Sequence, residues 1–230
     1  MNVTILQPSY IPWRGYFHQI LKSDLFIFYD DVQYDKRGWR NRNQVKTPHG
    51  KKWLTIPVKS HGAQTDNIPI NEIKIAWDEP WNESHLKTLH FAYNQAPFYS
   101  DYLSLIKPIF ERHDDFLADL TILLTTEISY CLGNKRTKFL RSSSLPSSGV
   151  KSDRLLSLLN QVGASNYISG PSAKDYLELE KFEAAGISVE FMTYDYPEYP
   201  QLYPPFDGNV SILDLLFMVG PKTKEYILTG

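Results

Sequence analysis

The chain has 230 residues, which is enough for one domain with a sizeable core. Its formal net charge is −2 at pH 7, so no global positive field recruits nucleic acid or an anionic membrane surface. The single cysteine, Cys131, excludes an internal disulfide and fits a reducing compartment.

Targeting signals are not visible in the sequence. The start of the chain has neither the basic residues nor the apolar stretch of a signal peptide. No apolar run approaches the roughly 18 residues that cross a bilayer. We therefore expect a cytoplasmic protein with no membrane insertion and no nucleic-acid partner.

Residues 3–31 read as a strand, a polar loop, a short helix and a second strand. The strands at 3–6 and 25–29 are continuously apolar, which is typical of a parallel sheet covered on both faces. A right-handed βαβ unit places the loop at the carboxyl end of the first strand, where open α/β sheets bind ligands. This loop is dense in functional groups, namely Gln7, Ser9, Tyr10, Trp13, Arg14 and Tyr16.

The middle of the chain predicts an insertion at about 44–135. In this interpretation the strands at 53–58 and 70–75 form an antiparallel hairpin around a loop at 59–67. Three helices follow: one from Pro80 or Asn82 to about Asn94, one at 97–112, and one capped by Asp114 that ends at Gly133. Their apolar residues recur at spacings of three and four, which favours a packed helical layer.

The parallel pattern then resumes, with strands at 137–141, 167–169 and 188–192. Helices are predicted at 152–162 with Ser152 as N-cap, at 171–177, and at 210–220 ending at Gly220. Five parallel strands with interleaved helices predict a single α/β domain with a doubly wound, Rossmann-like, mostly parallel sheet. From the strand order usual in doubly wound sheets, we expect the first strand and the strand ending at Ser169 to lie near the centre of that sheet.

A second loop, SGPSAKDY, is expected to face the first loop across the point where the strand order reverses. Ser169, Gly170, Ser172 and Lys174 surround a predicted helix start, whose free N–H groups suit an anion. A lysine is unfavourable at a helix N-terminus, so Lys174 indicates a phosphate or carboxylate ligand. The alternative is a well-capped helix with an exposed lysine.

Two carboxylates, Asp30 and Asp31, end the second strand beside the first loop. One of them could bind a sugar diol, hold a metal or act as a base. Side-chain alternation predicts that only one faces the site. The alternative is that one of them orients a nearby arginine.

A basic patch follows, made of Lys36, Arg37, Arg40 and Arg42 interleaved with Trp39, Asn41 and Asn43. Arginine forks suit bidentate binding of phosphate or carboxylate, and the tryptophan ring can stack. The alternative is a solvated loop. Because the patch lies close to Asp31 in sequence, one composite site is favoured.

Sharper catalytic motifs are absent from the sequence. It contains no Walker loop, GxGxxG, HExxH or GxSxG pattern, and no metal site is predicted. His18, at the expected start of the first helix, is a candidate base, although a solvent-facing histidine is the commoner case at such a position.

Across almost its whole length the chain resembles the WbqC-like protein family. The resemblance is carried by LQPSYIPWRGYF, SDLFIFYDDVQYDKRGWRNRN, KFLRSSSL, YISGPSAKDYL, and YPQLYPPF with SILDLLF, in that order. It implies a step in the synthesis of a bacterial surface polysaccharide of O-antigen type. The matching positions are Gln7, Pro8, Tyr10, Trp13, Gly15, Asp30, Asp31, Gln33, Lys36, Arg37, Arg40, Asn41, Arg42, Ser169, Gly170 and Tyr176.

The function implied by this resemblance is a transferase acting on a nucleotide or a nucleotide-linked (amino) sugar. Acyl or aminoacyl transfer from a carrier is one form of that reaction. In this hypothesis the arginines and the turn at 169–172 hold phosphate. Gln7, Tyr10 and Trp13 position the sugar or base, and Asp30 or Asp31 takes a proton from the accepting group.

Two alternatives stay open. A looser likeness to nucleotidyltransferases of the Rossmann-like class rests on PWRGYFHQ, where His18 falls three residues after Gly15. The histidines of that signature are missing at the matching places, which puts adenylyl transfer in doubt. The other alternative is a non-enzymatic sugar-binding or scaffold protein.

Overall fold

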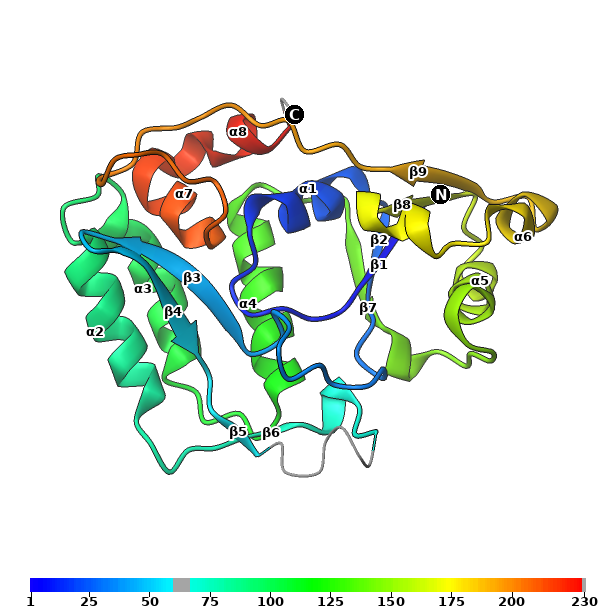
Figure 1. Cartoon of the computed structure of the whole chain (residues 1–230), viewed down its shortest axis with the longest axis horizontal. Helices are drawn as coiled ribbons and strands as arrows, with labels where there is room; N and C mark the ends of the chain where they lie inside the picture. Colours follow the sequence, from blue (N-terminus) through cyan, green and yellow to red (C-terminus); the bar gives the residue numbers. More distant parts are fainter. Residues whose placement is uncertain (60–66, 229–230) are drawn as a thin grey trace.

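A five-stranded parallel sheet forms the centre of the fold (Figure 1). The computed structural model of the chain describes residues 1–59 and 67–228. The strand order is β7-β2-β1-β8-β9, with bounds Asn2–Leu6 (β1), Leu25–Phe28 (β2), Lys138–Arg141 (β7), Asn166–Ser169 (β8) and Ser188–Phe191 (β9). Strand β1 is central and β8 is its neighbour, so the five predicted strands and their centre are confirmed.

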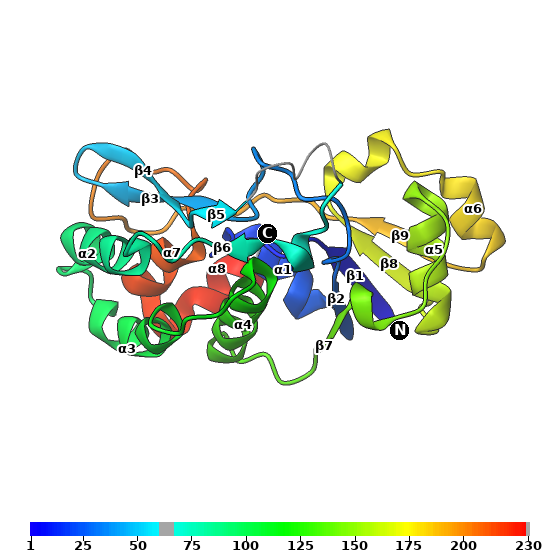
Figure 2. The ribbon, with the colours of Figure 1, turned by 90° about the horizontal axis from the view of Figure 1, so that it is seen from below.

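Helices cover both faces of this sheet (Figure 2). One face packs against α1 (Arg14–Lys22) and α4 (Leu117–Cys131), and the other against α5 (Lys151–Gln161) and α6 (Leu179–Ala184). Side chains alternate along β2, where Phe26 and Phe28 belong to the first core and Leu25 and Ile27 to the second. The prediction of a doubly wound, Rossmann-like sheet is therefore confirmed.

The segment between β2 and β7 holds two antiparallel pairs, and the predicted hairpin joins the wrong strands. Strand β3 (Arg42–Thr47) pairs with β4 (Gly50–Thr55), and β5 (Val58–Lys59) pairs with β6 (Lys74–Ile75). The turn between β3 and β4 uses Gly50 at a φ of +98°. Residues 70–72, predicted as strand, form a 3-10 turn (η1, Ile70–Glu72). Most of the loop predicted at 59–67 falls at 60–66, outside the described residues.

The three predicted helices of this segment are present as α2 (Trp81–Tyr93), α3 (Tyr99–Phe110) and α4. The predicted cap of α4 is wrong, because Phe116 occupies the N-cap position and Asp114 instead pairs with Arg112 at 3.2 Å. Near the end of the chain, α7 (Ile212–Val219) ends at Gly220 as predicted, followed by η4 (Gly220–Lys224) and α8 (Glu225–Leu228). None of the helices in the described parts of the chain is both long and apolar enough to cross a membrane.

The helix predicted at 171–177 is wrong. The chain forms a short 3-10 turn there (η3, Pro171–Asp175), and an unpredicted helix, α6, follows. A turn this short has no α-helical dipole to attract an anion, so the prediction for Lys174 loses its physical basis. Ser152 is not an N-cap either, since Val150 occupies that position and the Ser152 hydroxyl accepts a hydrogen bond from the backbone N–H of Glu178.

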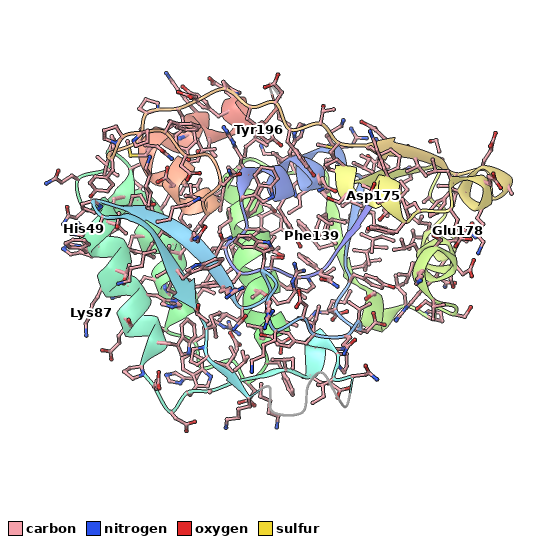
Figure 3. All side chains as sticks on the ribbon, viewed as in Figure 1. His49, Lys87, Phe139, Asp175, Glu178 and Tyr196 are labelled. Carbon is pink, nitrogen blue, oxygen red and sulfur yellow. The ribbon has the colours of Figure 1, made fainter. Side chains whose placement is uncertain are left out.

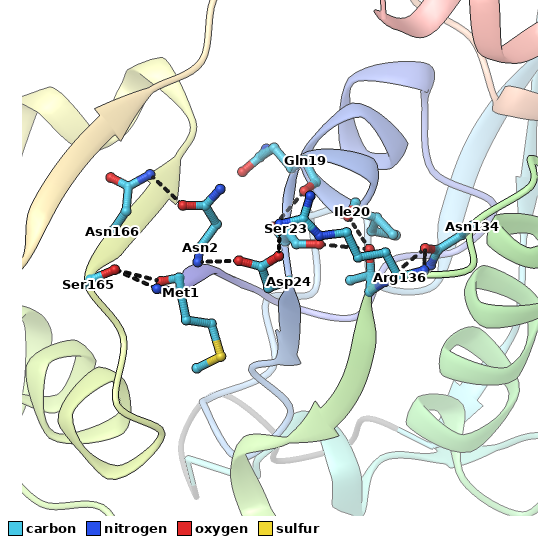
Figure 4. A network of polar contacts seen from close by, with 11 residues as sticks. Met1, Asn2, Gln19, Ile20, Ser23, Asp24, Asn134, Arg136, Ser165 and Asn166 are labelled. Carbon is cyan, nitrogen blue, oxygen red and sulfur yellow. Dashed lines mark hydrogen bonds and ion pairs between the residues drawn. The ribbon is translucent and has the colours of Figure 1, made fainter.

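A polar network ties together the amino ends of four strands (Figure 4). The Asp24 carboxylate, just before β2, accepts a hydrogen bond from the backbone N–H of Asn2 at 2.8 Å and pairs with Arg136, which precedes β7. The amino group of Met1 donates to the Ser165 hydroxyl, just before β8. The hydrogen bond from Asn2 is the main reason that the pKa of Asp24 lies below its usual value. The amino ends of these four strands are therefore held together by polar contacts.

Candidate functional site

A cleft of about 1100 Å³ lies at the carboxyl end of β1, beside β8, where the strand order reverses. Open α/β sheets bind their ligands at this position. Aromatic rings provide much of its lining, namely Trp13, Tyr16, Tyr29, Trp39, Tyr167 and Tyr176. The charged side chains on its walls are Arg40, Lys151, Asp175 and Glu178, and its polar ones include Gln7, Ser9, Gln19, Asn43 and Asn209.

The loop after β1 builds one wall of the cleft around the ring of Trp13. That ring packs edge-on against Tyr194, with the ring centroids 4.9 Å apart. Gly15 lies directly beneath it, since a Cβ atom at this position would come within 2.3 Å of the Trp13 ring. The Tyr16 hydroxyl donates to the carbonyl of Gln7 at 3.1 Å and closes the loop. The dense motif at 7–16 is therefore needed to hold Trp13 in place as well as to offer ligand contacts.

Arg40 is the cation that the basic patch contributes to the cleft. Its Nε atom is buried without a hydrogen-bond partner, and Arg40 forms no ion pair with any residue in the described parts of the chain. Burial lowers the pKa of its guanidinium, while the nearby Tyr16 and Asp35 act in the opposite direction. A half-buried guanidinium without an ion-pair partner is a strong binding group for an anion.

Two carboxylates line the far wall of the cleft. Asp175 ends the η3 turn after β8, and Glu178 follows it beside α5, where its backbone N–H is held by Ser152 (Figure 3). Lys151, the first residue of α5, also lines the cleft and has a φ of +50°. This left-handed conformation is costly for a lysine, and such strain is concentrated at functional sites. The far wall therefore offers both a base and a cation.

Asp30 and Asp31 do not line the cleft. The fully buried carboxylate of Asp30 accepts hydrogen bonds from the backbone N–H and the hydroxyl of Ser143, at 3.0 and 2.9 Å, and from Ser142 at 3.2 Å. Asp31 pairs with Arg154 at 2.5 Å. The Arg154 guanidinium lies 5.3 Å from the ring of Tyr29, which lines the cleft, so Arg154 and Tyr29 connect Asp31 to the cleft.

His18 and Tyr10 are both buried in the protein interior. The His18 Nδ1 atom lies 2.8 Å from the Tyr196 hydroxyl, and burial is the main cause that lowers the pKa of His18 to about 4. The Tyr10 hydroxyl lies 2.8 Å from Nδ1 of His85. Neither side chain lines the cleft, so direct contact with a ligand there is not supported for either one.

The other three basic side chains of the patch lie outside the cleft, whereas Trp39 and Asn43 line it together with Arg40. Arg42 donates to the Arg37 carbonyl at 2.6 Å and stacks 4.6 Å from the Trp53 ring, while the Asn41 amide donates to the carbonyl of Ile56. Lys36 and Arg37 are exposed. Of the four basic side chains, only Arg40 is brought to the cleft.

The remaining candidate residues do not line the cleft. They are buried Pro8, exposed Gln33, buried Ser169 (whose hydroxyl donates to Tyr167 at 3.3 Å), Gly170, exposed Ser172, and Lys174, which lies 5.3 Å from the Phe191 ring. By contrast Gln7, Trp13, Tyr16, Arg40 and Tyr176 all line the cleft.

Sequence reasoning missed three charged residues of the cleft: Lys151, Asp175 and Glu178. Asp175 belongs to the SGPSAKDY segment, and an acidic residue shortly after β8, the strand next to the central one, was a usable signal. Lys151 and Glu178 carried no such signal, because their place in the cleft depends on how α5 packs against the segment after η3.

Fold and site together define a Rossmann-like α/β protein with an aromatic-lined ligand cleft at the point where the strand order reverses. No group of three or more His, Cys, Asp or Glu side chains suited to a metal occurs among residues 1–59 and 67–228.

The chain belongs to the WbqC-like protein family, whose model matches residues 7–226. It is 40% identical over 229 residues to the uncharacterized protein Rv1507c of Mycobacterium tuberculosis, with 98% of this chain and 97% of that protein covered. No solved structure matches the chain. The family match begins at Gln7, the first polar residue of the cleft after β1.

Proposed function

We propose that the protein is a transferase acting on a nucleotide-linked sugar in the synthesis of a bacterial surface polysaccharide. The observation that carries this proposal is the half-buried Arg40 side chain, whose Nε atom is buried without a hydrogen-bond partner; Arg40 lines a cleft rich in aromatic rings and lacks an ion pair within the described residues. A diphosphate-linked sugar combines the two features that this cleft would bind. Its phosphates would pair with Arg40, and its base or sugar ring would stack on Trp13 or Tyr176.

The size of the cleft supports a reaction between two substrates. Ligand pockets in proteins usually measure roughly 300 to 1,000 Å³, and this cleft of about 1100 Å³ is slightly larger than that. A nucleotide-linked sugar and the reactive end of an acyl or aminoacyl carrier would both fit. The position at the carboxyl end of β1 is typical of nucleotide-binding sites in doubly wound sheets.

In the proposed reaction the amine of a nucleotide-linked amino sugar attacks the acyl carbon of the carrier. The new bond joins nitrogen to that carbon, and the bond from the carbon to the carrier's leaving atom breaks, with the electron pair leaving on the carrier. The amine gives up its proton to a carboxylate. Asp175 and Glu178 line the cleft, which favours them over Asp30 and Asp31 as this base.

Ligand-induced stabilisation of the intact protein tests the proposal. UDP-N-acetylglucosamine and related nucleotide sugars, at 100 times their dissociation constant, would stabilise the protein by about 2.7 kcal/mol. For a domain of this size that stabilisation raises the Tm by about 5 to 10 °C. Arg40→Ala should abolish the shift, whereas Arg37→Ala, which removes an exposed arginine outside the cleft, should preserve it.

Two outcomes contradict the proposal. One is a folded protein with no Tm shift across nucleotides and nucleotide sugars. The other is a shift of equal size in wild type and Arg40→Ala, because Arg40 would then take no part in binding. If binding is established, Asp175→Asn should leave the dissociation constant unchanged and lower turnover by about 100-fold, as expected for loss of a general base.

A further inference from the structure

Two large aromatic side chains, Trp39 and Trp53, lie side by side on the surface. Their exposed fractions are 47% and 41%, and their ring centroids are 5.3 Å apart with an interplanar angle of 32°. Trp39 comes from the segment after β2 and Trp53 from β4, so the fold brings them together from separate elements. Scattered exposed apolar residues are common on protein surfaces, but paired indole rings form a contiguous apolar surface suited to a ligand.

The Trp39–Trp53 pair is held in place from below. The Trp39 carbonyl accepts a hydrogen bond from the backbone N–H of Tyr10 at 3.0 Å, and Tyr10 is fully buried. Trp53 sits opposite Gln44 in the β3–β4 ladder. The Arg42 guanidinium lies 4.6 Å from the Trp53 ring. A ligand that docks on these rings therefore meets a surface whose backbone is already ordered.

The pair extends outward from the cleft, because Trp39 lines the cleft and Trp53 packs against Trp39 from outside it. A ligand whose reactive end enters the cleft can therefore rest its other end on the two rings. Two rings are too small a surface for a protein partner, since an indole contributes roughly 150 to 250 Å² and a stable protein interface needs about 800 Å² on each side.

Charge around the pair favours an anionic ligand. Lys36, Arg37 and Arg42 surround Trp39 in sequence, against one acidic residue in that stretch, Asp35. Arg42 also has a buried Nε atom without a hydrogen-bond partner. Stacking rings beside arginines are typical of sites for a nucleobase and its phosphates. Nucleic acid uses the same groups over a wider basic surface, which fits poorly with the net charge of −2.

We propose that Trp39, Trp53 and Arg42 form a second subsite, for the base and phosphates of a nucleotide-containing carrier of the coenzyme A type. The base contacts the exposed surface of the two indole rings, and the phosphates contact the cations at their edge. The carrier's thioester end then extends past Trp39 into the cleft. This assignment rests on the proposed function in naming the carrier as co-substrate, but the binding itself needs no turnover.

The test is calorimetric titration of the full chain with coenzyme A, adenosine 3′,5′-bisphosphate and pantetheine. We expect the first two to bind and pantetheine, which lacks the nucleotide, to bind at least tenfold more weakly. Trp53→Ala should weaken coenzyme A binding by about tenfold, or about 1.4 kcal/mol, through loss of base stacking. Phe91→Ala is the matched control, because Phe91 is an aromatic side chain 56% exposed on α2 and outside the subsite. Arg42→Gln provides a second variant that keeps both rings.

The outcomes separate this inference from the proposed function. Coenzyme A binding that is equal in wild type, Trp53→Ala and Arg42→Gln overturns the subsite, as does the absence of binding by both nucleotide probes. A single-stranded oligoadenylate that binds more tightly than coenzyme A, with the same dependence on Trp53, replaces the carrier with a nucleic acid and also overturns it. Loss of UDP-N-acetylglucosamine binding alone counts against the proposed function, while Trp53-dependent binding of coenzyme A would still support the subsite.

Discussion

Asp30 provides a direct test of whether the carboxylates after β2 stabilise the fold or carry out chemistry. Its fully buried carboxylate accepts three hydrogen bonds from Ser142 and Ser143, which form the turn after β7 (η2, Ser142–Ser144). Asp30 therefore links the carboxyl ends of β2 and β7. Hydrogen bonds to a charged group contribute about 1.5 to 3 kcal/mol each, and a buried donor left unpaired adds about 1 to 3 kcal/mol. Because these contributions overlap, we expect Asp30→Ala to lower the free energy of unfolding by about 3 to 5 kcal/mol.

Asp30→Asn refines this prediction. The amide oxygen can still accept from the backbone N–H of Ser143, and the amide nitrogen can donate to the Ser143 hydroxyl, so we expect a smaller loss of about 1 to 2 kcal/mol. Asp31→Asn is the comparison, since its amide oxygen can still accept from Arg154 or from the Ser142 hydroxyl, so we expect a loss of at most about 1 kcal/mol.

Urea denaturation of the three variants, with the midpoint and the slope fitted separately, measures these losses. The expected order of destabilisation is Asp30→Ala, then Asp30→Asn, then Asp31→Asn. The reasoning is refuted if Asp30→Ala unfolds within about 0.5 kcal/mol of wild type, a change usual for surface substitutions. Normal stability combined with lost turnover would return Asp30 to a catalytic role.

Three further predictions concern backbone strain and titration. Gly220→Ala should lower the free energy of unfolding, measured by urea denaturation, by about 2 to 4 kcal/mol, because φ is +56° and the new Cβ would lie 2.5 Å from the Phe98 ring. Gly133→Ala, where φ is +76° and the space around the new Cβ is open, should lower it by about 1 to 2 kcal/mol. The pKa of His85 is lowered to about 4, chiefly by burial, so the unfolded chain takes up the proton before the folded chain does as the pH falls. The contribution of His85 to the free energy of unfolding should therefore be fully present above about pH 6.5 and decline toward pH 4. His85→Gln should make this decline shallower when unfolding curves at pH 7 and pH 5 are compared. Lys151→Gly should raise the free energy of unfolding by about 1 kcal/mol, since it relieves a lysine held at a φ of +50°. It should also reduce the Tm shift caused by UDP-N-acetylglucosamine, because the far wall of the cleft loses a cation, and Lys151→Arg should change neither.

The parallel sheet could be predicted because its sequence signal is local and strong. Residues 25–28 are all apolar and all buried. Leu25 and Ile27 pack against the helices on one face of the sheet, and Phe26 and Phe28 pack against those on the other face. The positions of β1 and β8 near the centre followed from the strand order usual in doubly wound sheets. Their register and the polar network at their amino ends could not be predicted, because Asp24, Arg136 and Asn2 lie far apart in the sequence.

Strand β3 was missed because three of its four buried side chains, those of Asn43, Lys46 and Thr47, are polar and only Val45 is apolar. Asn43 is buried, yet its amide donates to the carbonyls of Tyr10 and Ile11, at 3.1 and 2.9 Å. Lys46 is also buried, and its ammonium donates to the side-chain oxygen of Gln201 at 2.6 Å. A strand that buries amides and an ammonium group carries no apolar alternation, so the pattern indicated a basic loop.

The position of the cleft followed from the sequence, whereas the charged side chains of its far wall did not. The loop after β1 supplies Gln7, Trp13 and Tyr16 to the cleft, because a loop at the carboxyl end of the central strand has nowhere else to lie. Asp30 and Asp31 end the neighbouring strand and were expected beside them, but the hydroxyls of the serine turn after β7 hold Asp30 away. The βαβ unit therefore identifies which segments meet at the site, namely the loop after β1 and the residues after β2. The hydrogen bonds from the turn after β7 then decide which of their side chains remain free to bind a ligand.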